Sequence, residues 1–188
     1  HSMSGSGTSA DPFIVSRAYD LRYIADKVAE RVPNYVYGYY ELKNDIDVNG
    51  GELKVIGDGT IVNGSASTFV GFFDGKGHTI SNYVINSENS SQVGLFGYVT
   101  VTGNDDGAGI IRNLNIDNFT VNANIPKDSG ASFVGSFVGV GVATNLVACN
   151  ATNGNINVFA GSGSTVFAGG AAGSLQSYTL QGGSTVSY

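Results

Sequence analysis

The chain has 188 residues, 41% of them hydrophobic, which is enough for one domain with a buried core. Its 28 glycines do not suit a helical bundle, and its net charge of −6 argues against nucleic acid as a partner, because phosphate binding requires clustered Lys and Arg. The single cysteine, Cys149, excludes an intrachain disulfide, and we expect it to be a small buried residue. The longest apolar run, 133–143, is too short to cross a bilayer, so no membrane insertion is expected.

The first ten residues differ in composition from the rest. Residues 1–10 are rich in Ser and Gly, which predicts a flexible leader, and His1-Ser2-Met3 is typical of a scar left by a purification tag. We expect residues 11–188 to form a single domain. The repeats described below stop abruptly, which suggests a fragment of a longer protein.

Residues 18–32 have the apolar spacing of an amphipathic helix. Ser16 is suited to be its N-cap, and Pro33 should end it. The apolar stripe consists of Leu21, Ile24, Ala25, Val28 and Val32. Because the open end of a stacked β-structure needs a cover, we expect this helix to cap the N-terminal end of the core.

Several β-prone runs separated by glycine turns follow the helix. The first, 35–42, contains the tyrosines Tyr35, Tyr37, Tyr39 and Tyr40. Such rings can stack on sugars, but alternating tyrosines in an edge strand more often serve packing. We therefore predict packing and rim positions for them.

From about residue 69, two features repeat. The first is a cluster with two glycines three or four residues apart, at 93–99, 133–139 and 167–173. The second is a short apolar run centred on Tyr83, Leu114, Leu146 and Tyr178, with steps of 31, 32 and 32 residues. A fixed period in this range is typical of a solenoid.

Each repeat contains three short β-prone runs, which would fill one triangular coil. The sequence therefore predicts an all-β fold, a right-handed parallel β-helix with coils of about 31 residues and the N-terminal capping α-helix. The central residues of the second feature should stack in line about 4.8 Å apart. The same coil position should recur at Asn82, Asn113 and Asn145. A β-sandwich is the alternative, because short strands with glycine turns also suit it.

The glycine clusters and the segments between them resemble the GLUG-repeat family. The resemblance depends on Gly94-Leu95-Phe96-Gly97, its degenerate copies at 135–139 and 169–173, and the intervening Ile-x-Asn-Leu-x-Ile runs. Upstream, 7–16, 40–48 and 73–82 are similar to segments that open such regions, so the resemblance covers roughly 7–180. The third copy departs from the pattern, with Ala171-Ala172 where larger apolar residues are expected.

This resemblance implies a secreted or surface-anchored bacterial protein. Members include adhesin-like proteins and the non-catalytic regions of IgA-cleaving metallopeptidases, whose chemistry is in a separate zinc domain. The present sequence contains no such domain.

Candidate catalytic residues are scarce. His78 is the one histidine besides His1, and no Cys pair or His-Glu-x-x-His accompanies it, so neither a zinc site nor a Ser–His–Asp triad is expected. We interpret His78 as a surface residue of a turn. We predict no catalytic residues and no cofactor.

The carboxylates allow two more specific hypotheses, one of catalysis and one of calcium binding. A polysaccharide hydrolase or lyase on a β-helix would use paired acids, and the candidates are Asp45 with Asp47, Asp74, and Asp105 with Asp106. Calcium could bind the alternating oxygens of Asp45, Asp47 and Asn49. The simpler prediction is that these residues are solvated or cap turns.

The sequence thus favours a non-catalytic, extracellular bacterial adhesin-like or structural module that presents a solenoid surface. The alternative is a polysaccharide-active β-helix enzyme. A host or matrix glycan or protein is the expected partner, and its binding residues cannot be assigned. No helical pattern follows Tyr178, so we expect the C-terminal coil to be an open edge capable of end-to-end self-association.

Overall fold

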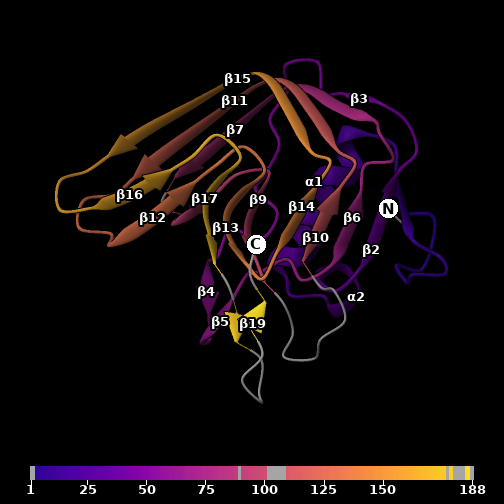
Figure 1. The fold of residues 1–188 in the computed structure, drawn as a ribbon, viewed down its shortest axis with the longest axis horizontal. Coiled ribbons are helices and arrows are strands. Elements are labelled where there is room, and N and C mark those ends of the chain that lie inside the picture. The colour runs from indigo at the N-terminus through magenta and orange to yellow at the C-terminus, as the bar shows by residue number, and fades with distance from the viewer. Residues whose placement is uncertain (1–2, 89, 101–108, 177, 180–184, 187–188) are drawn as a thin grey trace.

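The structure, a computed structural model, describes residues 3–88, 90–100, 109–176, 178–179 and 185–186. The chain winds into a β-solenoid of about four coils, in which parallel strands of successive coils lie side by side (Figure 1). This confirms the predicted all-β solenoid and rules out a sandwich of antiparallel sheets.

A capping segment comes first, with β1 (Phe13–Val15), α1 (Ala18–Ala29) and α2 (Pro33–Val36), and β1 pairs with β2 (Tyr39–Leu42) of the first coil. The first, incomplete coil comprises β2, β3 (Ile46–Asp47) and the hairpin of β4 (Ile61–Val62) and β5 (Ser65–Ala66). The second coil comprises β6 (Phe72–Asp74), β7 (Thr79–Glu88), β8 (Gln92–Val93) and β9 (Phe96–Val99). The third comprises β10 (Ile110–Arg112), β11 (Asn115–Ile125), β12 (Ala131–Val134) and β13 (Val138–Val142). The last comprises β14 (Asn145–Val147), β15 (Asn150–Ala160), β16 (Thr165–Ala168) and β17 (Ala172–Gln176), followed by the antiparallel pair β18 (Tyr178–Thr179) and β19 (Thr185–Val186).

Four parallel sheets form the sides of the solenoid. Sheet 1 has the order β1-β2-β6-β10-β14, and sheet 2 has the order β3-β7-β11-β15. Sheet 3 has the order β8-β12-β16, and sheet 4 has the order β9-β13-β17. Each complete coil therefore contributes four strands, and the predicted triangular coil of three strands is wrong.

The strand register contradicts the predicted alignment of apolar residues. Tyr83 is opposite Phe119, whereas Leu146 is opposite Ile111. Leu114 lies in the turn between β10 and β11, so Tyr83, Leu114 and Leu146 are not in line. Paired residues of complete coils are 34 to 42 residues apart, not 31.

The asparagines are also aligned differently from the prediction. Asn82 shares its coil position with Asn118 and Asn153, and all three have left-handed φ values, of 59°, 49° and 51°. Each makes a bend inside a long strand of sheet 2, where asparagine tolerates this conformation better than most residues. Asn113 instead lies at a corner, and Asn145 is opposite Ile110.

The glycine clusters of successive coils stack at the junction of sheets 3 and 4. A Cβ atom at Gly139 would lie 2.6 Å from the Val93 nitrogen and 2.8 Å from the Gly97 oxygen of the preceding coil. Only glycine permits this approach of two backbones. The third cluster keeps the pairing despite its alanines, since Ala172 is opposite Val138.

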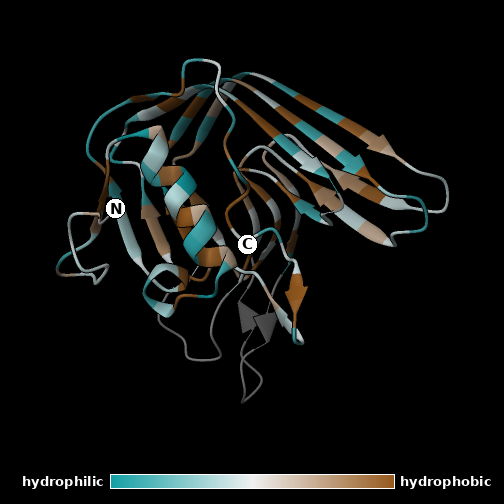
Figure 2. Ribbon diagram, turned by 180° about the vertical axis from the view of Figure 1, so that it is seen from behind, coloured by the Kyte–Doolittle hydropathy of each residue, from teal (hydrophilic) through white to brown (hydrophobic). Residues whose placement is uncertain are grey.

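The helix α1 covers the first coil, as predicted. Its residues Leu21, Ile24 and Val28 are buried in the core, and its Arg22 and Asp26 bond to Glu52 and Lys54 of the coil beneath. Figure 2, which views the molecule from behind, shows the helix lying across the neighbouring strands.

The predicted helix boundaries need correction. The N-cap is Arg17 rather than Ser16, because Arg17 has an extended backbone and its carbonyl accepts the Asp20 N–H, while the Asp20 carboxylate accepts the Arg17 N–H in return. The helix ends at Ala29, and Pro33 begins α2 instead of terminating a helix of residues 18–32.

The N-terminal leader packs against the domain. Met3 is buried, Ile14 donates its N–H to the Ser4 carbonyl, and Tyr39 donates its N–H to the Gly7 carbonyl. Residues 3–10 are therefore part of the fold, contrary to the prediction of a flexible leader. In the part of the chain that the structure describes, no helix combines the length and apolarity needed to span a membrane.

Candidate binding groove at a corner of the solenoid

The chain turns from sheet 1 to sheet 2 at the same corner of every coil. The corner segments are 43–45, 75–78, 113–114 and 148–149. Lys76, Asn113 and Ala148 make the bend with φ values of 53°, 51° and 51°. Backbone bonds join the corners of successive coils, since Gly77 donates to the Asn113 carbonyl at 2.8 Å. This corner is therefore a regular, rigid edge along the solenoid.

Two hollows lie along this corner and share Lys76. Their volumes are about 620 Å³ and 670 Å³. We call them together the corner groove. Its polar lining includes Arg17, Lys43, Lys76, His78, Arg112 and Asn115, with the carboxylates of Asp20, Glu41 and Asp74.

Asp74 lines the second hollow of the groove, and its side chain is only 2% exposed. Its Oδ1 accepts the Lys76 backbone N–H at 2.8 Å and the Asn113 amide at 3.3 Å, and its Oδ2 accepts Arg112 Nε at 2.9 Å. Burial alone would raise the pKa of the Asp74 carboxyl, but the hydrogen bonds from Lys76, Arg112 and Asn113 outweigh it and lower this pKa. Asp74 is thus an ionised anchor that fixes Arg112.

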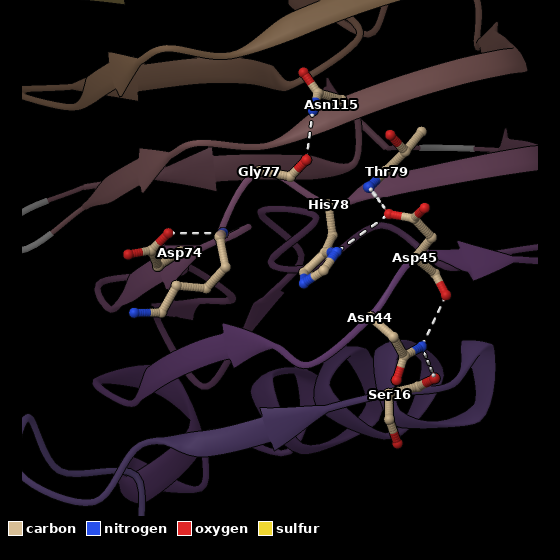
Figure 3. A network of polar contacts seen from close by, with 9 residues as sticks. Ser16, Asn44, Asp45, Asp74, Gly77, His78, Thr79 and Asn115 are labelled. Atoms are coloured by element: carbon tan, nitrogen blue, oxygen red, sulfur yellow. Dashed lines mark hydrogen bonds and ion pairs between the residues drawn. The ribbon is translucent and has the colours of Figure 1, made fainter.

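A second network fixes the corner at the first two coils (Figure 3). Asp45 Oδ1 accepts the Thr79 backbone N–H at 2.9 Å and lies 3.2 Å from His78 Nδ1. The amide of Asn44 donates to the Ser16 carbonyl at 3.0 Å. His78 is therefore a residue of the corner turn, as predicted, and it lines the groove, with Asp45 as its partner.

An aromatic stack adjoins the groove on sheet 1. The rings of Tyr39 and Phe72 stack at 5.4 Å, and the guanidinium of Arg112 lies 4.6 Å from the centre of the Phe72 ring. The other tyrosines of the run mostly serve packing, as predicted. Tyr40 is fully buried, Tyr35 stacks on Phe13 and Tyr37 is 52% exposed.

The proposed calcium ligands serve as turn and coil connections. Asp47 Oδ1 accepts the Asn82 amide at 2.9 Å and the Asn49 backbone N–H at 2.8 Å, and these bonds lower the pKa of Asp47. Among the described residues, no group of three His, Cys, Asp or Glu side chains could hold a metal ion. Calcium binding by Asp45, Asp47 and Asn49 stays an untested alternative to the predicted solvated or turn-capping roles.

Two further candidates have different outcomes. Asp105 and Asp106 lie outside the described residues. Cys149 is half-buried, its Sγ lies 3.4 Å from the Ile111 carbonyl, and burial raises the pKa of its thiol. This environment suits the predicted small packing residue better than a reactive thiol.

Sequence reasoning did not single out the cations of the groove. Glu41, Asp74 and Arg112 form one row across sheet 1, because strands β2, β6 and β10 pair in that register. A correct register would have placed Arg112 beside Asp74 from the sequence alone. The misaligned period of 31 residues concealed this row.

The fold and the groove together define a class, that of β-solenoid modules with a polar surface groove. Among curated proteins, the chain is similar to Halomucin of Haloquadratum walsbyi (strain DSM 16790 / HBSQ001), with 34% identity over 118 residues. The match covers 63% of this chain but only 1% of the length of Halomucin. The likeness and the solenoid are compatible with a structural surface module. No protein family and no solved structure matches the chain, so the GLUG resemblance stays a prediction.

Proposed function

We propose that this chain is a non-catalytic, adhesin-like module of a secreted or cell-surface protein, and that its corner groove binds a glycan. The observation that carries the proposal is the groove itself, which is lined by fixed polar side chains and whose Arg112 lies over the Phe72 ring of the Tyr39–Phe72 stack. Binding sites typically combine apolar or aromatic surface with a few well-placed polar groups.

The groove chemistry suits sugars. The hydroxyl groups of a glycan can accept hydrogen bonds from Asn115, Lys76 and Arg112, and the aromatic rings can pack against the C–H faces of a sugar ring. Because the two hollows follow the solenoid corner, they offer room for an extended chain rather than a single small molecule.

Location outside the cell is supported by the likeness to Halomucin, whose name denotes a mucin-type product, and by the resemblance to the GLUG family. The regular corner and the stacked sheets would also let the module act as a spacer. A host or matrix protein, instead of a glycan, is the second possible partner of an adhesin of this kind.

The absence of catalysis is part of the proposal. The carboxylates near the groove already make structural hydrogen bonds, Asp74 to Arg112 and Asp45 to Thr79. The competing hypothesis is a polysaccharide hydrolase or lyase that uses paired acids, with Asp45, Asp47 and Asp74 as the candidates among the described residues. Incubation with pectins, alginates and mucin glycans should release no reducing ends or unsaturated products. Product that disappears in Asp45→Asn or Asp74→Asn would establish the enzyme instead.

A glycan array tests the binding directly. The native chain should retain at least one glycan class, and the double variant Arg112→Ala/Asn115→Ala should lose most of that signal. The control, Asn124→Ala/Lys127→Ala, removes one amide and one positive charge outside the groove and should bind normally. If no glycan binds, or if both double variants lose binding equally, the proposal fails.

We also expect the coils to wind in the right-handed sense. Connections between parallel strands of one sheet are right-handed in about 98% of cases, because a right-twisted strand leads back to its sheet most easily that way. A crystal structure with left-handed coils would contradict this expectation.

A further inference from the structure

The charges of the corner groove are distributed unequally between its floor and its surface. The carboxylates of Asp20 and Asp74 are buried, with side chains 3% and 2% exposed. The cations paired with them are exposed, Arg17 by 62% and Arg112 by 45%. The buried carboxylates therefore hold the paired guanidinium groups in place, and the charged groups that face the solvent are mainly positive.

The remaining charges of the groove continue this asymmetry. Lys76, 47% exposed, lies 3.3 Å from Glu41, which at 33% exposed is the most accessible acid of the lining. Lys43 is exposed and forms no ion pair with any described residue. Among the described residues, four cations and three anions line the groove, which gives the lining a formal charge of +1. The whole chain has a net charge of −6, so the remainder carries −7.

Three of these cations follow the solenoid axis at one per coil. Lys43 belongs to the corner of the first coil, Lys76 to that of the second, and Arg112 ends β10 next to the corner of the third. Neighbouring strands are about 4.8 Å apart, so the backbones that carry these side chains rise in even steps. A polymer lying along the corner would meet a positive group at every coil.

We propose that the glycan bound by the corner groove is acidic, and that its carboxylate or sulfate groups bind Lys43, Lys76 and Arg112. This inference rests on the proposed function. Arg112 uses Nε to bind Asp74, which leaves its two terminal nitrogens as donors, and a guanidinium can bind a carboxylate or sulfate through two parallel bonds. Uncharged glycans would leave the three cations unneutralised.

The test measures the affinity of the chain for three polymers, namely polygalacturonate, dextran sulfate and uncharged dextran, at low and high NaCl. We expect at least tenfold tighter binding of one acidic polymer than of dextran, and a marked loss of that binding at high salt, because salt screens exposed charges. The comparison of polygalacturonate with dextran sulfate shows whether carboxylate or sulfate is preferred.

Two double variants with the same change in net charge locate the site. Lys43→Gln/Lys76→Gln should weaken binding of the acidic polymer at least tenfold. Lys54→Gln/Lys127→Gln removes two exposed lysines outside the groove and should change it less than twofold. Circular dichroism should show both variants folded.

The outcomes distinguish this inference from the proposed function. If dextran or other uncharged glycans bind in the groove as tightly as the acidic polymers, the acidic ligand is wrong but the glycan-binding function stands. If both double variants weaken binding equally, the attraction is non-specific and the inference fails. If no glycan of either kind binds, both proposals fail.

Discussion

The two ends of the solenoid differ in what covers them. At the N-terminal end, α1 lies over the first coil, and its Leu21, Ile24 and Val28 are at most 2% exposed. At the other end, β14, β15, β16 and β17 are each the last strand of a sheet. Large apolar side chains of this last coil are exposed, namely Val147 by 50%, Phe159 by 63%, Phe167 by 48% and Leu175 by 45%.

The comparison of β11 with β15 shows the origin of this difference. The two strands pair along nearly their full length, and both alternate apolar with polar residues. Val121 of β11 is fully buried, whereas Ile156 opposite it in β15 is only partly buried. Burial in this fold therefore depends on the coil stacked above each strand, as expected for a quasi-one-dimensional protein.

The largest expected effect is at the capped end. Leu21→Asp would bury a carboxylate in the core beneath α1, and an unpaired buried charge costs about 3–5 kcal/mol. We expect a sharp fall in melting temperature, measured by circular dichroism. Leu175→Asp, at the open end, should cost much less, because that side chain is 45% exposed. Equal losses in the two variants would show that the ends do not differ.

A glycine substitution tests the stacking of the last coil on the third. A Cβ atom at Gly154 would lie 2.1 Å from the ring of Phe119. The Phe119 ring therefore fills the space that a side chain at position 154 would need. Gly154→Ala should therefore destabilise by about 1–3 kcal/mol through overpacking, measured by denaturant unfolding. Gly170→Ala is the control, because no atom lies within 4 Å of its Cβ position. A neutral Gly154→Ala would mean that the last coil adds little stability.

Loss of the hydroxyl group should change the free energy of unfolding differently at two buried tyrosines, Tyr40 and Tyr83. Tyr40 donates to the Tyr35 carbonyl at 2.6 Å, so Tyr40→Phe should cost about 1 kcal/mol. The Tyr83 hydroxyl is buried without a hydrogen-bond partner among the described residues, so Tyr83→Phe should be neutral or stabilising. Unfolding free energies measure both changes. Destabilisation by Tyr83→Phe would show that the Tyr83 hydroxyl has a hydrogen-bond partner.

The smallest expected effect is a loss of stability in acid. Asp47 bonds the first coil to Asn82 of the second, and Asp117 bonds the third to Thr152 and Asn153 of the last. These bonds lower the pKa of both carboxyls, so the folded state favours the ionised form. Their stabilisation is complete above the unfolded pKa of about 3.9 and is lost as the pH falls through the lower folded pKa. Melting temperatures from pH 6 to pH 2 should therefore drop below about pH 4, and less in Asp47→Asn/Asp117→Asn.

Local patterns made part of the fold predictable from the sequence. The helical spacing of Leu21, Ile24 and Val28 specified a buried stripe, and the glycine clusters marked the places where coils approach each other. The register was not predictable in this way because corner lengths vary. The corner at 75–78 has four residues, whereas those at 113–114 and 148–149 have two.

The candidate site depended on that register. His78 and Asp45 were each considered, but their contact joins residues 33 positions apart, and the Arg112–Asp74 contact joins residues 38 apart. No local signal pairs such residues. The leader was misjudged for a similar reason, since the burial of Met3 depends on contacts with distant segments.

Hydrogen exchange of the dilute chain tests the central claim, that each coil is protected by the coil stacked on it. Peptides from β7 and β11 have strands on both sides in sheet 2, whereas β15 has a strand on one side. We predict slow exchange over 80–86 and 116–123 and exchange at least tenfold faster over 151–158, because the outward N–H groups of β15 lack a strand partner in the described structure. Equal protection of β15 and β11 in the monomer would contradict an open C-terminal end.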